Sequence, residues 1–73
     1  MSAKAFKTNL SLFRWEAKLS QQKLCDKLEI PIKRYQAWEE GRSQPDIDTL
    51  ELLADFYTIS LDELMTRNLV KIN

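Results

Sequence analysis

The sequence predicts an all-α domain built from five short helices. Apolar residues recur at helical spacings of three and four, and no stretch shows the strict alternation of a half-buried strand. Serine, aspartate and glycine, which commonly cap helices, stand at the borders of these apolar segments. The links between the segments are short, about two to five residues, so the helices must pack compactly rather than form an extended bundle.

The first helix is expected over about residues 5–18. Its apolar residues follow one another at steps of four, three and four, which places them on one face. They are Phe6, Leu10, Phe13 and Ala17.

Two short helices come next, over residues 21–28 and 32–40. Ser20 is a good N-cap for the first of them. Pro31 suits the first turn of the second, because its missing N–H costs little there, and Gly41 suits a left-handed C-terminal cap. Both helices are too short to be stable alone, so they must form by tertiary packing. The expected inward residues are Leu24, Cys25, Leu28, Ile32, Tyr35 and Trp38.

The last two helices follow a loop over residues 42–45. Asp46 caps the fourth helix, and Ser60 with Glu63 forms a capping box that opens the fifth over residues 61–65. The inward stripe expected on the fourth helix consists of Ile47, Leu50, Leu53, Ala54 and Tyr57.

The composition of the 73 residues argues against catalysis and metal binding. The chain has one cysteine, Cys25, and no histidine, so it cannot form an internal disulfide and offers no histidine ligand or base. Gly41 is the only glycine, which excludes a glycine-rich phosphate loop. We therefore expect no enzyme, no cofactor and no metal.

The same composition predicts a single soluble domain over residues 1–73. No apolar run approaches the ~20 residues needed to cross a bilayer. The first ten residues lack the apolar stretch of a secretory signal. We expect a cytoplasmic protein that does not associate with membranes.

The net charge of zero conceals a polar distribution of charge. Residues 1–44 hold nine basic and five acidic residues, a net charge of +4, whereas residues 45–73 hold two basic and six acidic residues, a net charge of −4. Such a separation can orient a protein on a polyanion. The other interpretation is a chance scatter of surface charge.

An ordered set of residues stands at fixed spacing between Leu19 and Met65, and it extends back through Leu10, Phe13 and Arg14. It consists of Leu19-Ser20-Gln21, Leu24, Leu28, Trp38-Glu39-x-Gly41, Pro45, Leu50 and Ser60-Leu61-x-Glu63-Leu64. The set resembles the lambda-repressor-like helix-turn-helix family (Cro/C1 type, also called XRE). The match covers about residues 10–65 and leaves 66–73 as a C-terminal tail. The resemblance implies a compact five-helix DNA-binding domain whose second and third helices form the helix-turn-helix.

The resemblance places the third helix in the major groove of double-stranded DNA. The positions that read bases in the family fall on Ile32, Lys33 and Ala37. Lys33 is the best candidate for donating to O6 and N7 of guanine, and Ile32 is suited to a thymine methyl group.

Other positions carried over from the family concern phosphates and the support of the reading helix. Gln21 begins the second helix, where the family commonly uses a glutamine for both purposes. Arg34, Gln36 and Arg42 match positions that touch phosphates or neighbouring bases, and Lys23 adds a further phosphate contact.

Each of these interpretations has a structural alternative. Lys33 and Arg34 also fit an ordinary solvated helix face, and Gln21 also fits a plain helix-start residue. Tyr35 and Trp38 are expected in the core rather than as a stacking platform, because their spacing puts them on the buried side.

Three residues are expected to be structural. The family commonly pairs an arginine of the first helix with a glutamate of the third, and Arg14 and Glu39 stand at those positions. Such a pair would attach the reading helix to the scaffold, with a small net effect on stability. Cys25 occupies a position where the family usually has alanine, so we expect a buried small hydrophobe rather than a redox switch.

The sequence departs from the family pattern at and near the reading helix. Glu29 replaces a turn glycine, and if its backbone is left-handed it adds roughly 1 kcal/mol of strain. Pro31 replaces the usual serine or threonine cap. Ile32 and Ala37 make the reading face less polar, and Glu40 adds a negative charge where asparagine is frequent.

Apolar residues outside the inward stripes predict a homodimer. A two-fold dimer would double the contact that one module makes with DNA. We expect the interface at Phe56, Leu69 and Val70; in the alternative, these side chains complete the core of a monomer. The residues outside the stripes and in the tail are Leu12, Trp15, Leu52, Phe56, Leu69, Val70 and Ile72.

These observations predict a small transcriptional regulator that binds double-stranded DNA in a sequence-specific manner. The alternative is a protein–protein interaction module on the same fold, such as an antitoxin-like or accessory factor that binds a protein partner.

Overall fold

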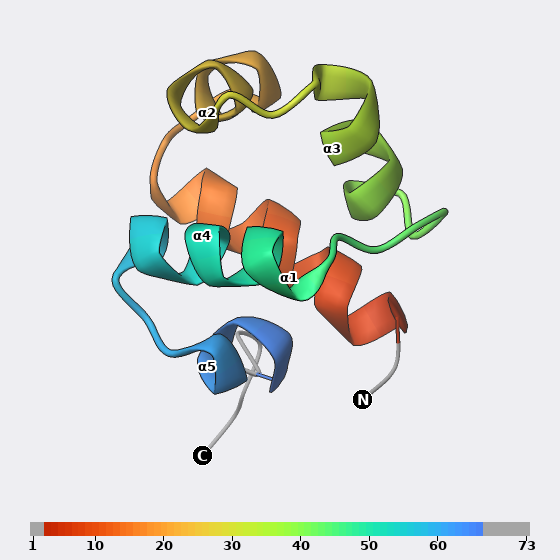
Figure 1. Cartoon of the computed structure of the whole chain (residues 1–73), viewed down its shortest axis with the longest axis vertical. Coiled ribbons are helices and arrows are strands. Elements are labelled where there is room, and N and C mark those ends of the chain that lie inside the picture. Colours follow the sequence, from red (N-terminus) through yellow and green to blue (C-terminus); the bar gives the residue numbers. More distant parts are fainter. Residues whose placement is uncertain (1–2, 67–73) are drawn as a thin grey trace.

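The described part of the chain is helical and contains no strand. The computed structural model describes the backbone of residues 3–66 and the side chains of residues 9–66. Five helices follow one another along it, which confirms the predicted all-α class (Figure 1). They are α1 (Ala3–Glu16), α2 (Gln21–Leu28), α3 (Ile32–Glu39), α4 (Ile47–Tyr57) and α5 (Leu61–Thr66).

Helix α1 lies in the middle of the domain and joins its two ends. It contacts α3 and α5, while α2 packs on α3 and α4 packs on α5. Figure 1 shows α2 and α3 together at one end of the molecule and α5 at the other, with α1 and α4 between them. Helix α3 is therefore supported from behind by the longest helix of the described chain, and its other side faces outward.

The first helix ends two residues earlier than the spacing of its apolar residues predicts. Lys18 adopts a left-handed backbone (φ 59°), and the N–H of Leu19 donates to the carbonyl of Arg14 at 3.2 Å. The guanidinium of Arg14 also donates to the carbonyl of Leu19 at 2.9 Å, which further fixes the turn. Ala17 consequently lies in the turn with its side chain exposed, so the prediction that it belongs to the buried stripe is wrong.

The predicted caps are present at three helix starts. Ser20 Oγ accepts from the N–H of Lys23 at 3.1 Å, and Asp46 Oδ1 accepts from the N–H of Thr49 at 2.9 Å. At α5, the N–H of Glu63 donates to Ser60 Oγ at 3.0 Å and the Glu63 carboxylate accepts from the N–H of Ser60 at 3.4 Å, which is the predicted capping box.

Helix α3 begins without a side-chain cap, because Pro31 has no polar side chain to accept from its first N–H groups. It ends at Glu39, one residue before the expected position, and Gly41 adopts the predicted left-handed backbone (φ 77°). Glu29, at the end of α2, is left-handed too (φ 56°), so the expected strain of roughly 1 kcal/mol applies to the turn that leads into α3.

The core draws on every helix. Tyr35 is fully buried, Trp38 is 7% exposed and Cys25 is 2% exposed, which confirms the prediction that all three are core residues. The buried cluster consists of Leu10, Phe13, Leu24, Cys25, Tyr35, Trp38, Leu50, Leu53, Ala54 and Leu64.

One buried polar residue was not predicted. Asn9 is 4% exposed, and its side-chain amide donates to the carbonyl of Leu64 at 3.1 Å. This hydrogen bond attaches α1 to the last turns of α5 and satisfies a carbonyl near a helix end.

The apolar residues outside the core divide into exposed and half-buried groups. Ile47 is 57% exposed, so the prediction that it faces inward is wrong: it is the first residue of α4, a turn before Leu50, and lies beyond the edge of the core. Leu52 is 42% exposed and Trp15 is 70% exposed. Phe56 is half-buried and packs edge-to-face on Tyr57, with ring centroids 5.1 Å apart. The tail residues Leu69, Val70 and Ile72 lie outside the described residues.

Candidate nucleic-acid interface

The outward face of α3 carries residues from the start of the helix and from its second turn. Tyr35 and Trp38 are buried against the core, so residues on the opposite side of the helix face outward. Lys33 is exposed on this side, and Gln36, three residues later, is half-buried. This face is therefore polar at its centre and carries one exposed cation.

Two of the three predicted base-reading residues are less accessible than the resemblance implies. Ile32 is half-buried and packs against the core. Ala37 is 9% exposed, so its methyl group offers little surface to a ligand. Ala37 follows Lys33 by four residues and therefore lies on the same side of α3, so its place in the base-reading set stays a prediction. Lys33 is the member of the set that is exposed.

An ion pair joins α1 to the C-terminal end of α3. Arg14 Nε donates to Glu39 Oε2 at 2.7 Å, and Arg14 Nη2 donates to Glu39 Oε1 at 3.1 Å, which is the two-pronged geometry that a guanidinium forms with a carboxylate. The two side chains are 13% and 8% exposed. The pair predicted from the sequence is thus formed, and it is largely shielded from solvent.

Two glutamines extend this ion pair toward the surface of α3. Gln21 Nε2, at the start of α2, donates to Glu39 Oε1 at 3.0 Å. Gln36 Nε2 donates to Gln21 Oε1 at 3.3 Å. A chain of polar contacts therefore runs from Arg14 through Glu39 and Gln21 to Gln36. Sequence reasoning assigned Gln21 to the support of the reading helix but did not pair it with Gln36, because the two are 15 residues apart and no local pattern links them.

The charges of this network are fixed by their neighbours. Burial works to raise the pKa of Glu39, but the hydrogen bonds from Arg14 and Gln21 and the nearby Tyr35 hydroxyl outweigh it, so the pKa lies below its usual value. The hydrogen bond to Glu39 raises the pKa of Arg14 against the effect of burial. Glu39 is therefore an ionised carboxylate that accepts hydrogen bonds and donates none.

Two buried hydroxyl groups lie near the ion pair. Burial, followed by the proximity of Glu39, raises the pKa of both Tyr35 and Tyr57, so both phenols are neutral. Among the residues that the structure describes, no atom forms a well-aligned hydrogen bond with either hydroxyl oxygen. The apolar surroundings of these rings hold the ion pair in a medium of low polarity, which strengthens it.

The remaining predicted cations differ in their surroundings. Lys23 is exposed on α2. Arg42, just after α3, donates from Nε to Glu40 Oε1 at 2.7 Å, and both side chains are more than half exposed. A surface pair of this kind contributes at most ~1 kcal/mol and can open to release the guanidinium.

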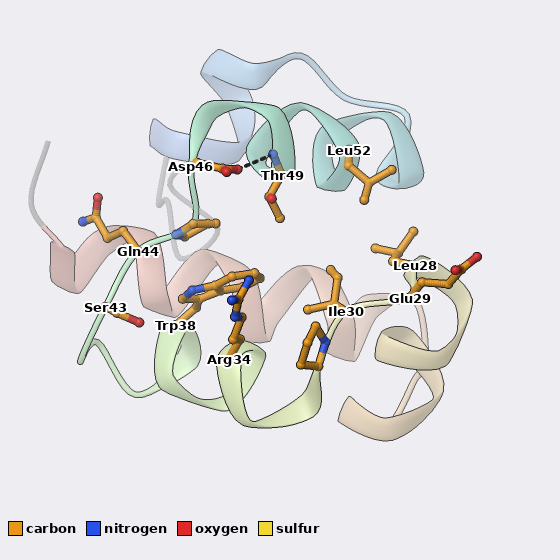
Figure 2. A pocket seen from close by; sticks show the side chains of 12 residues that line it. Leu28, Glu29, Ile30, Arg34, Trp38, Ser43, Gln44, Asp46, Thr49 and Leu52 are labelled. Carbon is orange, nitrogen blue, oxygen red and sulfur yellow. Dashed lines mark hydrogen bonds between the residues drawn. The ribbon is translucent and has the colours of Figure 1, made fainter.

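Arg34 points away from the Lys33 side of α3. It lines a groove of about 420 Å³ between the end of α2, α3 and the start of α4. Figure 2 shows Arg34 beside Trp38, with Asp46 and Thr49 across the groove on the start of α4. The hydrogen bonds from Thr49 and, to a smaller extent, the charge of Arg34 lower the pKa of Asp46.

The arrangement of α2 and α3 joins two short helices through a tight turn, with the second helix presented outward, and a helix-turn-helix family model matches residues 4–64. The chain belongs to the Cro/C1-type helix-turn-helix family. The predicted fold class, a lambda-repressor-like five-helix domain, is thereby confirmed. In characterised helix-turn-helix domains the second helix of the motif lies in the major groove.

Three relatives of the helix-turn-helix domain are transcriptional regulators by name. An uncharacterised HTH-type transcriptional regulator, YqaE, of Bacillus subtilis is 40% identical over 60 residues. The transcriptional repressor RstR of the cryptic phage CTXphi in Vibrio cholerae is 30% identical over 61 residues, and the HTH-type transcriptional activator BcrR of Enterococcus faecalis is 26% identical over 61 residues.

These matches cover most of this chain and a smaller part of each relative. They span 82–84% of this chain, 52% of YqaE, 55% of RstR and 30% of BcrR. No solved structure matches the chain. Within the described residues, no helix is long and apolar enough to span a membrane, and no cluster of side chains has the composition of a metal site.

Proposed function

We propose that this chain binds double-stranded DNA as the reading domain of a transcriptional regulator, with α3 in the major groove. Lys33 supports the proposal most directly: it is exposed on the outward face of α3, and the Arg14–Glu39 ion pair holds that helix on the scaffold. Its ammonium group can donate to O6 and N7 of guanine. Ile32 borders it and can contact a thymine methyl group.

The cations around α3 would position the domain on the phosphates. Lys23 and Arg42 are exposed, and Arg34 is exposed at the mouth of its groove, so each can reach an anion without unfolding any element. Such contacts fix register and orientation but carry no sequence information. The proposed activity is binding without catalysis, as expected for a domain over residues 1–73 of this composition.

Fluorescence anisotropy with a random pool of DNA duplexes tests this function. We expect affinity to fall steeply as salt rises, because cations displace counterions from the phosphates. Lys33→Ala should weaken binding to a selected site by about 5-fold to 150-fold. Lys27→Ala, which removes the same charge at the opposite end of α2 from Gln21, is the matched control and should change affinity much less. Salt-independent or undetectable binding would reject the proposal.

A homodimer is the second part of the proposal. Leu52 and Phe56 are four residues apart and therefore share one side of α4, where Leu52 is 42% exposed. This side, together with the tail residues Leu69 and Val70, is the proposed interface. We expect sedimentation velocity at micromolar concentration to show a dimer that Leu52→Asp dissociates. A strictly monomeric profile of the parent chain would reject the interface.

A protein–protein interaction module is the alternative function on the same fold. It is favoured by the exposure of Leu52 and Ile47 on α4. Under this alternative, Lys33→Ala and Arg34→Ala leave function unchanged, whereas Phe56→Ala or removal of the tail abolishes it. The two sets of variants therefore separate the two functions.

A further inference from the structure

A groove runs along one side of α3, and the contacts proposed with DNA do not fill it. It has a volume of about 420 Å³ and lies between the end of α2, α3 and the start of α4 (Figure 2). Pockets that bind ligands commonly measure about 300–1,000 Å³. The groove is therefore large enough to take several side chains of a binding partner.

The two ends of the groove differ in polarity. Leu28 and Ile30 line one end and are half-buried, and Leu52 borders the same end and is 42% exposed. The other end is polar, because Ser43 and Gln44 are exposed there. Figure 2 shows Leu28 and Leu52 at one end and the two polar residues at the opposite end. An occupant that fills the groove must therefore be apolar at one end and polar at the other.

Arg34 carries a positive charge in the middle of the groove. Its side chain is exposed and lies beside Trp38, between the apolar and the polar end (Figure 2). Within the described part of the chain, no carboxylate forms an ion pair with Arg34. A guanidinium binds a carboxylate through two parallel hydrogen bonds. The middle of the groove therefore favours an occupant with a carboxylate.

Two acidic residues also line the groove, but neither pairs with Arg34. The carboxylate of Glu29 points away from the centre of the groove (Figure 2). Asp46 lies across the groove and caps α4, where its Oδ1 accepts from the N–H of Thr49 at 2.9 Å. A carboxylate can accept several hydrogen bonds, so Asp46 can also bind an N–H group of the occupant.

A segment of a protein meets these requirements together. It supplies an aliphatic side chain for the apolar end, a carboxylate for Arg34 and a backbone N–H for Asp46. A DNA strand carries a negative charge on every nucleotide, which Asp46 would repel inside the groove. Arg34 reaches phosphates only from the mouth of the groove, so a phosphate and a carboxylate within the groove compete for it.

We propose that this groove binds an extended segment of a partner protein in which an acidic residue stands beside an aliphatic residue, and that the segment competes with DNA for Arg34. The site is separate from the Phe56 surface considered above. The competition rests on the DNA-binding function proposed above, whereas the binding of the segment does not. A partner with such a segment would release the domain from DNA.

Display of short random peptides on phage, with the parent chain as the target, tests the site. We expect the enriched sequences to share an aspartate or glutamate beside an aliphatic residue. A synthetic copy of an enriched peptide should bind the parent chain and lose about 10-fold to 150-fold in affinity for Arg34→Glu. Lys27→Glu is the matched control, because it reverses the charge of an exposed residue of α2 that does not line the groove. It should bind the peptide like the parent chain.

Two further measurements locate the peptide in the groove. Trp38 lines the groove, and the other tryptophan of the chain, Trp15, is 70% exposed. Trp15→Phe therefore leaves the fluorescence of Trp38 alone, and the peptide should change this emission. Display against Arg34→Glu should enrich a lysine or arginine in place of the acidic residue, which also shows that this variant is folded.

The competition is measured with the same peptide and a selected DNA duplex. The peptide should weaken DNA binding by about 5-fold to 150-fold, and DNA should weaken peptide binding by the same factor. If no acidic–aliphatic motif is enriched, or if Arg34→Glu binds the peptide as tightly as the parent chain does, the assignment of the groove is wrong. Peptide binding that leaves the affinity for DNA unchanged rejects the competition. Absence of salt-dependent DNA binding by the parent chain rejects the DNA-binding function and the competition with it, while the peptide measurements still decide the groove.

Discussion

Helices α3 and α4 lie on the same scaffold but are held by different kinds of contact. Helix α4 starts at the Asp46 cap, runs for 11 residues and buries Leu50, Leu53 and Ala54. Helix α3 has 8 residues and no side-chain cap at its start. It is attached through two buried aromatic rings and through Glu39, which receives hydrogen bonds from α1 and α2.

The contacts of α4 mainly stabilise the fold, whereas the contacts of α3 also fix the orientation of that helix. Burial of apolar surface is not directional, so it can hold α4 in the core without fixing each side chain. Hydrogen bonds and ion pairs depend on angle and distance, so they fix the rotation of α3 and the polarity of the side chains on its surface. A helix that must present named groups to a ligand benefits from the second kind of contact.

Breaking the ion pair should have the largest effect. Arg14→Met leaves the Glu39 carboxylate shielded from solvent without its partner, and we expect the free energy of unfolding to fall by about 3–5 kcal/mol. Urea denaturation measures this change. The double variant Arg14→Met/Glu39→Met should lose clearly less than the sum of the two single variants, since it removes both charges. If the double variant instead loses as much stability as the two single variants together, Arg14 and Glu39 are not energetically coupled.

A cavity in the α4 side of the core should lower the free energy of unfolding nearly as much, but it should leave the base preferences of the domain unchanged. Leu53 is fully buried, and Leu53→Ala should lower the free energy of unfolding by about 3 kcal/mol. Below its unfolding temperature this variant should keep the base preferences of the parent chain, because the network at α3 is unchanged. Arg14→Met should alter those preferences under the same conditions. If Leu53→Ala altered them as strongly, the separation of stability from orientation would be wrong.

Acid should weaken the α3 attachment through Glu39. Its pKa is lower in the folded chain than in the unfolded chain, so the unfolded chain binds more protons in this range and stability rises with pH. The contribution of Glu39 is therefore complete above its unfolded pKa of about 4.3 and is lost as the pH falls through its folded pKa. Unfolding free energies measured between neutral and strongly acidic pH should fall less steeply below about pH 4.3 in Glu39→Gln. An unchanged slope would contradict the assignment.

Relief of backbone strain should give the smallest change in the free energy of unfolding, and this change should be an increase. Glu29 and Thr58 end α2 and α4 with left-handed backbones, at φ 56° and φ 58°. Glu29→Gly should stabilise the domain by about 1 kcal/mol or less. Thr58→Gly should stabilise the domain more than Glu29→Gly, because a β-branched side chain tolerates a left-handed backbone least. Destabilisation by both substitutions in thermal unfolding would show that these positions are not strained.

Much of the fold was predictable because it depends on residues close together in the chain. Helix α2 has the predicted bounds, and the caps at Ser20, Asp46 and Ser60 form as predicted. The burial of Tyr35 and Trp38 also followed from their spacing. The prediction of the first helix was less accurate at its end, since the left-handed turn at Lys18 is stabilised by Arg14 and Leu19 rather than by a local glycine.

For the candidate site, the contacts that hold α3 were predicted in part, whereas the residues assigned to DNA stay a prediction. The family resemblance identified Gln21, Lys33, Gln36 and the Arg14–Glu39 pair, of which the pair and the support of α3 by Gln21 are formed. The burial of Ala37 was not visible in the sequence, because it depends on what packs beside α3.

The sequence by itself determined the five helices, most of their ends and the residues of the core, because helical spacing, capping and the transfer of apolar side chains from water act locally. The tertiary structure alone decided the Asn9–Leu64 hydrogen bond, the exposure of Ile47, the direction of Arg34 and the contact between Gln21 and Gln36. Each of these depends on the distance and angle between two helices. Those quantities are set by how all the side chains pack together, so no local pattern in the sequence records them.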